Sequence, residues 1–230
     1  MAVKKTFFNW SSGKDSAIAL HYLLQDESYS IECLLTSISK ELQRVTMHGL
    51  QKELLVKQLE SIGIPYKLLE LPESPSHKVY NKLMNEKINY FKGNGYSHSA
   101  FGDIFLEDLR EYREAQFKSS GIKAVFPLWK KDTRLLLEEF FSLGFKAIVI
   151  CVDGQKLDKS FVGRELDQSF LADLPENVDP CGENGEFHTF CYDGPIFKNP
   201  ISFEVGGKVD RTYESNGNSF VFYFCELTTV

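Results

Sequence analysis

A short polar segment near the beginning of the chain carries the residue types that bind phosphate. It reads Ser11, Ser12, Gly13, Lys14, Asp15 and Ser16. Hydroxyl groups and an unhindered glycine N–H can approach an anion closely, and the first turn of a following helix adds free N–H groups. Lys14 adds a cation, and Asp15 beside a phosphate implies a shared Mg²⁺ ion or a role in orienting its neighbours. The alternative is a polar strand-to-helix turn with an N-cap serine.

This segment is not the Walker loop of kinases and GTPases. That loop requires the pattern G-x-x-x-x-G-K-[ST]. Phe8 stands where its first glycine belongs, and Asp15 stands where it needs Ser or Thr. The sequence therefore predicts a phosphate site of another type.

Two charged groups follow in the middle of the chain. Asp103 comes after Gly102 at the end of an apolar run, where it can hold a metal ion or position an acceptor. The alternative for Asp103 is a cap of the next helix. Arg110 and Arg113 lie one helical turn apart and could clamp an anion, although exposed arginines on a helix often have no such task.

The densest group of reactive side chains lies near residue 185. Two carboxylates, an amide, an imidazole and a hydroxyl occur within seven residues: Glu183, Asn184, Glu186, His188 and Thr189. Glycines on either side permit a tight loop. Such a loop suits recognition of an amine-bearing acceptor or ammonia, with Glu186 or His188 able to move a proton. A polar surface loop is the alternative, and the apolar residues within the segment argue against it.

Alternating strand and helix patterns position these residues. Strands are expected at 6–10, 31–37, 66–71, 97–101, 123–126 and 147–152, and helices at 14–25, 50–62, 78–92, 107–119 and 133–143. The alternation predicts an α/β fold with a parallel sheet, whose carboxyl edge is the usual ligand site. We expect an ATP-binding domain at 1–126 and a substrate-binding domain at 127–230. The latter ends in antiparallel hairpins around Gly206-Gly207 and residues 216–218.

The overall composition of the chain limits the classes of partner and the cellular compartment that we expect. The net charge of −6 argues against nucleic acid or an anionic membrane, because such partners need a basic face. No apolar run reaches spanning length. The cysteines are odd in number and lack a C-x-x-C pair, which suits reduced thiols and predicts a cytoplasmic protein: Cys33, Cys151, Cys181, Cys191 and Cys225. A zinc site from Cys181, His188 and Cys191 would not match standard zinc spacing.

The motifs together resemble a known family. Residues 11–16 resemble the Ser-Gly-Gly-Lys-Asp-Ser loop of the N-type ATP pyrophosphatases (PP-loop ATPases), with Ser12 in place of the first glycine. The segments 102–104, 109–113, 127–129 and 181–189 then follow in the order found in the diphthine–ammonia ligase (diphthamide synthase) family. The resemblance runs from Trp10 to about Pro195. It implies an adenine nucleotide alpha hydrolase-like first domain and a substrate-contacting second domain.

The resemblance also implies roles for individual residues. ATP and Mg²⁺ would be bound by residues 11–16, Gly102 and His48, with Asp15 and Asp103 toward the metal ion. Helix capping is an equal alternative for His48. The residues implied toward the substrate are Arg110, Arg113, Asn184 and Thr189, and those implied in catalysis are Asp103, Glu183, Glu186 and His188.

Two positions depart from the diphthine-specific pattern. Asn184 replaces a glycine and His188 replaces a carboxylate, so one negative charge is lost where a cationic acceptor would bind. The variant looks like the bacterial branch of the family, for which a cobamide precursor is the implied acceptor in place of diphthine.

The expected activity is an ATP-dependent, AMP-forming ligation. A substrate carboxylate would be adenylated and then amidated by ammonia or an amine, with release of AMP and pyrophosphate. One alternative is a PP-loop tRNA-modifying or sulfur-transfer enzyme, and another is a non-catalytic ATP-sensing module. The sequence is compatible with a homodimer.

Overall fold

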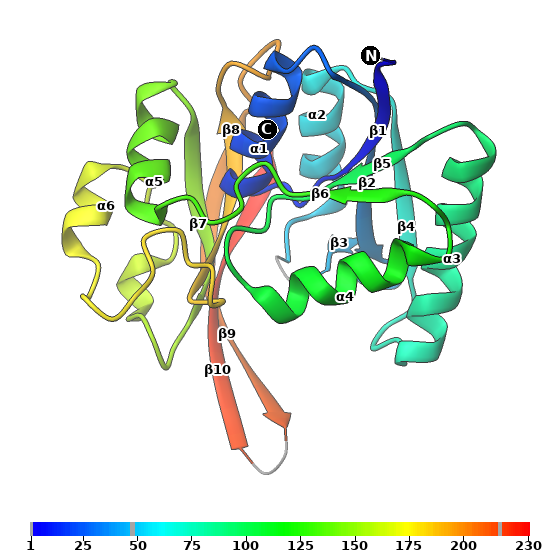
Figure 1. Cartoon of the computed structure of the whole chain (residues 1–230). Helices are drawn as coiled ribbons and strands as arrows, with labels where there is room; N and C mark the ends of the chain where they lie inside the picture. Colours follow the sequence, from blue (N-terminus) through cyan, green and yellow to red (C-terminus); the bar gives the residue numbers. More distant parts are fainter. Residues whose placement is uncertain (1, 47–48, 216–217) are drawn as a thin grey trace.

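The computed structural model describes residues 2–46, 49–215 and 218–230 (Figure 1). The first half of the chain contains β1 (Lys4–Asn9), α1 (Lys14–Gln25), β2 (Tyr29–Ser39), β3 (Arg44–Val45), α2 (Lys52–Ile62), β4 (Tyr66–Leu71), α3 (His77–Gly93), β5 (His98–Ala100), α4 (Glu107–Lys118) and β6 (Lys123–Val125). The second half contains α5 (Thr133–Ser142), β7 (Lys146–Asp153), the 3-10 helix η1 (Lys159–Phe161), α6 (Gln168–Asp173), β8 (Phe187–Asp193), β9 (Phe203–Ser215) and β10 (Asn218–Thr229).

A mostly parallel sheet forms the first half. Its strand order is β3-β2-β1-β5-β6, and β4 pairs with β2. All described pairs are parallel except β2 with β3, which is antiparallel. The predicted α/β fold is thus confirmed, with β3 as a short strand that the sequence patterns did not reveal. Its length of 2 residues is too short for a recognisable alternation.

Successive residues of β1 divide the interior into two layers. Phe7 stacks on Phe91 of α3 with ring centroids 3.9 Å apart, on the face that α3 and α4 cover. Phe8 points the other way, into the cluster that also holds Ile18 of α1 and Leu55 of α2. This alternation follows from the strand's two-residue period.

Helices α1 and α2 lie between the parallel sheet and a second, antiparallel sheet (Figure 1). The second sheet has the order β8-β7-β10-β9. One buried cluster includes Leu34 of β2, Leu55 of α2 and Val149 of β7, so a continuous core joins both sheets. The division into domains 1–126 and 127–230 remains a prediction, because a core shared by both sheets does not show where a domain boundary lies.

The end of the chain differs from its expected turns. Gly206 and Gly207 lie inside β9, where a register irregularity places them opposite Glu226. A Cβ on Gly206 would lie 3.1 Å from the Glu226 carbonyl oxygen, so close approach of the two strands explains the glycine. The expected turn there was wrong. Of the second turn, expected around residues 216–218, residues 216 and 217 lie outside the described residues, and Asn218 begins β10.

Helix ends match local signals in the sequence. Asp132 caps α5 by accepting a hydrogen bond from the Leu135 N–H at 2.9 Å. Helix α2 ends at Gly63, whose φ of 77° is accessible to glycine at little cost. None of the helices in the described part of the chain is long and apolar enough to cross a membrane.

Candidate active site

The polar loop predicted to bind phosphate lies at the carboxyl end of β1, where α1 begins. The Ser11 hydroxyl donates to the Ser16 hydroxyl at 3.0 Å, and the Ser16 hydroxyl donates to the Gly13 carbonyl at 2.9 Å. The Ser12 backbone has a φ of 73°, in the left-handed region. The loop therefore curls over the start of α1, where unpaired N–H groups and the helix dipole favour an anion.

Lys14 joins this loop to residues 181–189, the segment dense in reactive side chains, which we call the third motif. Its ammonium group donates to the Asp15 carboxylate at 2.8 Å and to the Cys181 carbonyl oxygen. Its backbone N–H donates to the Thr189 hydroxyl at 3.0 Å. The side chain is only 4% exposed. Burial acts to lower the pKa of Lys14, but the Asp15 carboxylate, Cys181 and Glu183 together outweigh it, and the pKa is raised.

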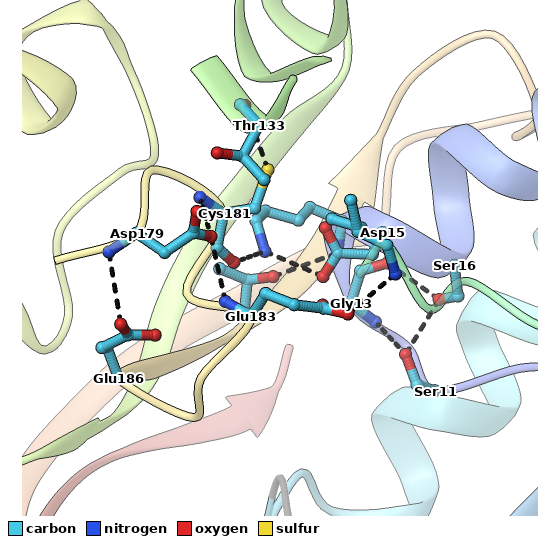
Figure 2. Close-up of polar contacts among 12 residues, drawn as sticks. Ser11, Gly13, Asp15, Ser16, Thr133, Asp179, Cys181, Glu183 and Glu186 are labelled. Carbon is cyan, nitrogen blue, oxygen red and sulfur yellow. Dashed lines mark hydrogen bonds and ion pairs between the residues drawn. The ribbon is translucent and has the colours of Figure 1, made fainter. Parts of the chain in front are cut away.

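The Asp15 carboxylate lies beside the Lys14 ammonium and the residues of the third motif (Figure 2). Burial raises the pKa of Asp15, and the Lys14 ammonium opposes that rise. One carboxylate oxygen of Asp15 is held by Lys14, while Oδ1 is buried without a hydrogen-bond partner among the described residues. The Ser12 hydroxyl is also buried without such a partner. Buried polar atoms that lack partners cost free energy, so both atoms fit contact with a bound ligand.

Gly102 brings the end of the β5 strand against the loop. A Cβ on Gly102 would lie 3.0 Å from the Asp15 carbonyl carbon and 3.0 Å from the Ser16 nitrogen. A contact this tight is rare in proteins, so the loop backbone would have to move by a few tenths of an ångström to accept a Cβ. Gly102 is therefore placed for close backbone approach.

Asp103 and Arg113 form an ion pair beside the loop. The guanidinium Nε lies 2.7 Å from Asp103 Oδ2, and Nη2 donates to Oδ1 at 3.1 Å. Arg113 also lies over the Phe101 ring at 4.3 Å. Arg110 points elsewhere, to Glu114 at 2.7 Å and to the Trp129 ring at 4.6 Å. The two arginines thus hold different partners in this structure.

Within the third motif, carboxylates hold the backbone in a tight loop. Glu186 accepts hydrogen bonds from the Asp179 N–H at 3.2 Å, the Asn184 N–H at 2.9 Å and the Asn184 amide at 3.0 Å. Glu186 is 2% exposed. Asp179 accepts from the N–H groups of Cys181 and Glu183 at 2.9 and 3.1 Å (Figure 2). The hydrogen bonds between Glu186 and Asn184 therefore hold the loop in a fixed conformation.

The Glu183 side chain connects the third motif to the residues that follow β5. Its Oε1 accepts hydrogen bonds from the N–H groups of Ile104 at 2.7 Å and Phe105 at 3.4 Å. Burial and the neighbouring Asp15 charge raise the pKa of Glu183 to about 7, against an ordinary value of 4.5. A carboxylate with a pKa near neutrality can both accept and donate a proton under physiological conditions.

His188 and Thr189 lie on β8, whereas the sequence placed them in a loop. Phe187–Asp193 pairs with β7, and His188 is opposite Cys151. The loop expectation was wrong for these residues, because the strand pairing depends on a partner far away in sequence. Burial, with the Lys14 charge, lowers the pKa of His188 to about 4, so its imidazole is neutral at physiological pH.

No group of three or more metal-ligating side chains occurs among the residues that the structure describes. The Cys181 thiol instead donates to the Thr133 carbonyl at 3.3 Å, so the zinc arrangement is not formed there. Asp15 offers an oxygen donor of the kind that Mg²⁺ prefers when water and phosphate supply most of the ligands. The predicted role of His48 lies outside the described residues.

Sequence reasoning missed two residues that shape the site. Asp179 organises the third motif, and the following Pro180 was an available turn signal. Gln58 lies on the buried face of α2 between Leu55 and Leu59 and contacts the polar loop. A polar residue in an apolar stripe is a signal that was available, but it does not say which group it meets.

Two family models match most of the chain. The model described as Diphthamide synthase N-terminal domain matches residues 4–124, and the Diphthamide synthase C-terminal domain matches residues 132–220. The Diphthine--ammonia ligase of Bos taurus is 35% identical over 128 residues, 53% of this chain and 48% of that protein. The enzyme of the same name from Homo sapiens is 34% identical over 128 residues, with the same coverage of 53% and 48%.

A further relative and a solved structure are also similar to the chain. The Diphthine--ammonia ligase of Schizosaccharomyces pombe is 34% identical over 104 residues, 44% of this chain and 17% of that protein. The chain therefore spans about half, or less, of the length of these curated relatives. The U34-tRNA thiolase NcsA from Methanococcus maripaludis aligns with a TM-score of 0.39 and 18% identity, over 62% of this chain and 59% of that one.

Proposed function

The chain belongs to the diphthamide synthase family, and we propose that it is an ATP-dependent amide-forming ligase of the diphthine–ammonia ligase type. One observation carries the proposal. The loop suited to phosphate and the carboxylate-rich third motif, 175 residues apart at Lys14 and Thr189, meet at a hydrogen bond of 3.0 Å. An adenylating site needs these two functions side by side, because the activated carboxyl group must stay near the phosphates until nitrogen arrives.

The proposed reaction proceeds in two steps. In the first, a carboxylate oxygen of the acceptor attacks the α-phosphorus of ATP, and the bond to the β-phosphate oxygen breaks to release pyrophosphate. In the second, ammonia attacks the acyl carbon, and AMP leaves with the electron pair of the C–O bond. The nitrogen loses a proton to a base, and the product is an amide.

Residues of the loop have the groups needed to bind the phosphates. The N–H groups of Asp15 and Ser16 at the start of α1 and the buried Ser12 hydroxyl would donate to phosphate oxygens, while the Lys14 N–H is held by Thr189. Bound Mg²⁺ would neutralise phosphate charge, with Asp15 and Asp103 as the residues that would hold it. Lys14 contributes through its link to the third motif, since its ammonium group is directed at Cys181 and Asp15.

Glu183 is the base that the geometry favours. Its pKa of about 7 lies near the operating pH, as efficient general bases require. Glu186, in contrast, is held by three hydrogen bonds within its own loop and would position Glu183. His188 is neutral at physiological pH, and it is half-buried on β8 where it would line the acceptor site.

The acceptor is proposed to differ from diphthine. Diphthine bears a trimethylammonium group, and His188 supplies no negative charge where the diphthine-specific pattern has a carboxylate. We therefore place the chain in the bacterial branch, with a cobamide precursor that has a free carboxylate as its acceptor. We further propose division into domains 1–126 and 127–230, a cytoplasmic location and a homodimer, the last being testable by light scattering.

ATP–pyrophosphate exchange tests the proposal. The purified protein is offered, in turn, a cobamide precursor with a free carboxylate and elongation factor bearing diphthine, with and without ammonia. Exchange is expected with the cobamide precursor, and amide formation should follow only when ammonia is present. Exchange with the diphthine-bearing factor alone would keep the ligase reaction and overturn the proposed acceptor. ATP binding without exchange under any condition would instead favour a sensing module, and sulfur incorporation into tRNA would favour a thiolation enzyme.

Two variants make the exchange assay specific. Asp15→Asn removes the loop carboxylate at nearly constant volume, and exchange should fall at least about a hundredfold. Glu27→Gln removes an exposed carboxylate outside the site and should leave exchange unchanged. Equal rates in the two variants would refute the assignment of residues 11–16.

A further inference from the structure

A buried amide on α2 holds the backbone of the phosphate-type loop. Gln58 is 0% exposed, and its Nε2 donates to the Ser12 carbonyl oxygen at 3.0 Å. The same nitrogen donates to the Cys191 carbonyl oxygen on β8 at 2.5 Å. Gln58 thus connects the first loop of the parallel sheet to the edge strand of the antiparallel sheet.

The orientation of this amide is fixed by a third contact. The Trp10 indole N–H donates to Gln58 Oε1 at 2.7 Å. Both N–H groups and the oxygen of the amide therefore have partners. If the amide were flipped, Nε2 would face the indole N–H and the oxygen would face two carbonyls, which is electrostatically unfavourable. The direction of the amide donors is consequently set by the buried core.

The loop residue that Gln58 holds has an unusual backbone conformation. Ser12 has a φ of 73°, which costs free energy for a residue with a Cβ. The Ser12 carbonyl receives hydrogen bonds from Gln58 and from the Cys191 N–H at 2.9 Å. These two bonds favour the left-handed conformation over the relaxed one. That conformation also places the Ser12 hydroxyl in the interior with no hydrogen-bond partner among the described residues.

We propose that Gln58 is a positioning residue for the phosphate groups of ATP, which it affects through the Ser12 backbone without contacting the nucleotide. The inference rests on the proposed function in one respect, namely that residues 11–16 bind phosphate. Gln58 would preorganise the loop before ATP arrives, and preorganisation strengthens binding because less ordering is needed on association. Through Cys191, the same amide makes the loop geometry depend on β8, the strand that carries His188 and Thr189.

Equilibrium binding of ATP and of AMP distinguishes positioning from general support of the fold. Gln58→Met has a similar volume and lacks both donors. We expect its affinity for ATP to fall about tenfold, which corresponds to about 1.4 kcal/mol of binding free energy. The affinity for AMP should change less than about twofold. The reason is that the loop would be relaxed only where the β- and γ-phosphates bind. Each protein is first checked by thermal unfolding.

Two further variants keep the test decisive. Gln58→Glu retains the acceptor for the Trp10 indole and removes both donors, so it should show the same selective loss at about pH 8 even if Gln58→Met does not fold. Leu55→Ala enlarges the core beside the same helix face and leaves all three hydrogen bonds of the Gln58 amide in place. It should lower the unfolding temperature while keeping the ratio of ATP to AMP affinity near that of the wild type.

The outcomes separate the inference from the proposed function. Unchanged ATP affinity in the Gln58 variants, or equal losses for ATP and AMP, would overturn the positioning role. A loss of the affinity ratio in Leu55→Ala as large as in Gln58→Met would also overturn it. A wild-type protein that binds neither nucleotide would refute the proposed function itself.

Discussion

Replacing Glu183 by Gln should change how the stability of the protein depends on pH. The substitution keeps the oxygen that accepts hydrogen bonds from Ile104 and Phe105 and removes the ionisable group. In the folded protein the pKa of Glu183 is raised to about 7 from 4.5, first by burial and then by the Asp15 charge. The folded state therefore binds this proton more tightly than the unfolded state does.

The sign of the effect follows from proton linkage. Because the folded pKa is raised, the stabilisation from proton uptake is fully present below the unfolded value of 4.5 and is lost as the pH rises through about 7. The full difference corresponds to about 3 kcal/mol, at about 1.4 kcal/mol for each pKa unit. Allowing for partial exposure of the side chain, we expect about 2 kcal/mol between about pH 5 and about pH 8.

Urea unfolding of the wild type and of Glu183→Gln at both pH values measures this term. The free energy of unfolding of the variant should exceed that of the wild type by about 2 kcal/mol more at the higher pH than at the lower. The comparison between proteins matters because His188 has the opposite dependence. Its lowered pKa of about 4 gives stability that is present above 6.5 and lost as the pH falls through 4.

An exposed carboxylate serves as the matched control. Glu60→Gln on the outer face of α2 should leave the pH dependence as it is in the wild type. A constant difference in stability between Glu183→Gln and the wild type across the range would refute the raised pKa. It would also remove the reason for assigning Glu183 as the base. If the assignment holds, the more stable variant should have lost amide formation.

Three substitutions test the packing of the site. Gly102→Ala should weaken ATP binding at least about tenfold, because the new Cβ would lie 3.0 Å from the loop backbone. Gly93→Ala, whose Cβ would meet open space, is the control in the same binding assay. Arg113→Met should lower the free energy of unfolding by about 1–3 kcal/mol, since it leaves the Asp103 carboxylate without its partner at 2.7 Å, and unchanged urea midpoints would contradict this ion pair's role. Lys14→Ala should abolish exchange activity and also lower the free energy of unfolding by about 1–3 kcal/mol in calorimetry, because the buried ammonium links the loop to the third motif. Loss of exchange alone would show that the contacts of Lys14 to that motif contribute little to stability.

Local patterns were sufficient to predict the framework of the site. The apolar run before residues 11–16 and the helical spacing after them place the loop at a strand's carboxyl end, which the structure confirms. The alternation of short apolar strands with amphipathic helices likewise predicted the mostly parallel sheet. Both inferences depend on periodicity over a few residues, which the backbone geometry of each element imposes directly.

The partners of individual side chains could not be predicted in the same way. Sequence spacing allowed Arg110 and Arg113 to share one anion, yet each has a separate carboxylate partner in the structure. Glu186 had the chemistry of a proton carrier but is enclosed by the N–H groups of its own loop. Such choices depend on desolvation and on groups that are close only after folding.

The sequence by itself determined the residue types of the site and the elements that carry them, because hydrophobic period, glycine and capping residues act over a few positions. Only the tertiary structure decided that Lys14 joins Cys181, that Gln58 holds Ser12, and that the carboxylate of Glu183 is buried enough to titrate near neutrality. Those properties arise where two sheets close on a common core, so they depend on distances and solvent exclusion that no local pattern encodes.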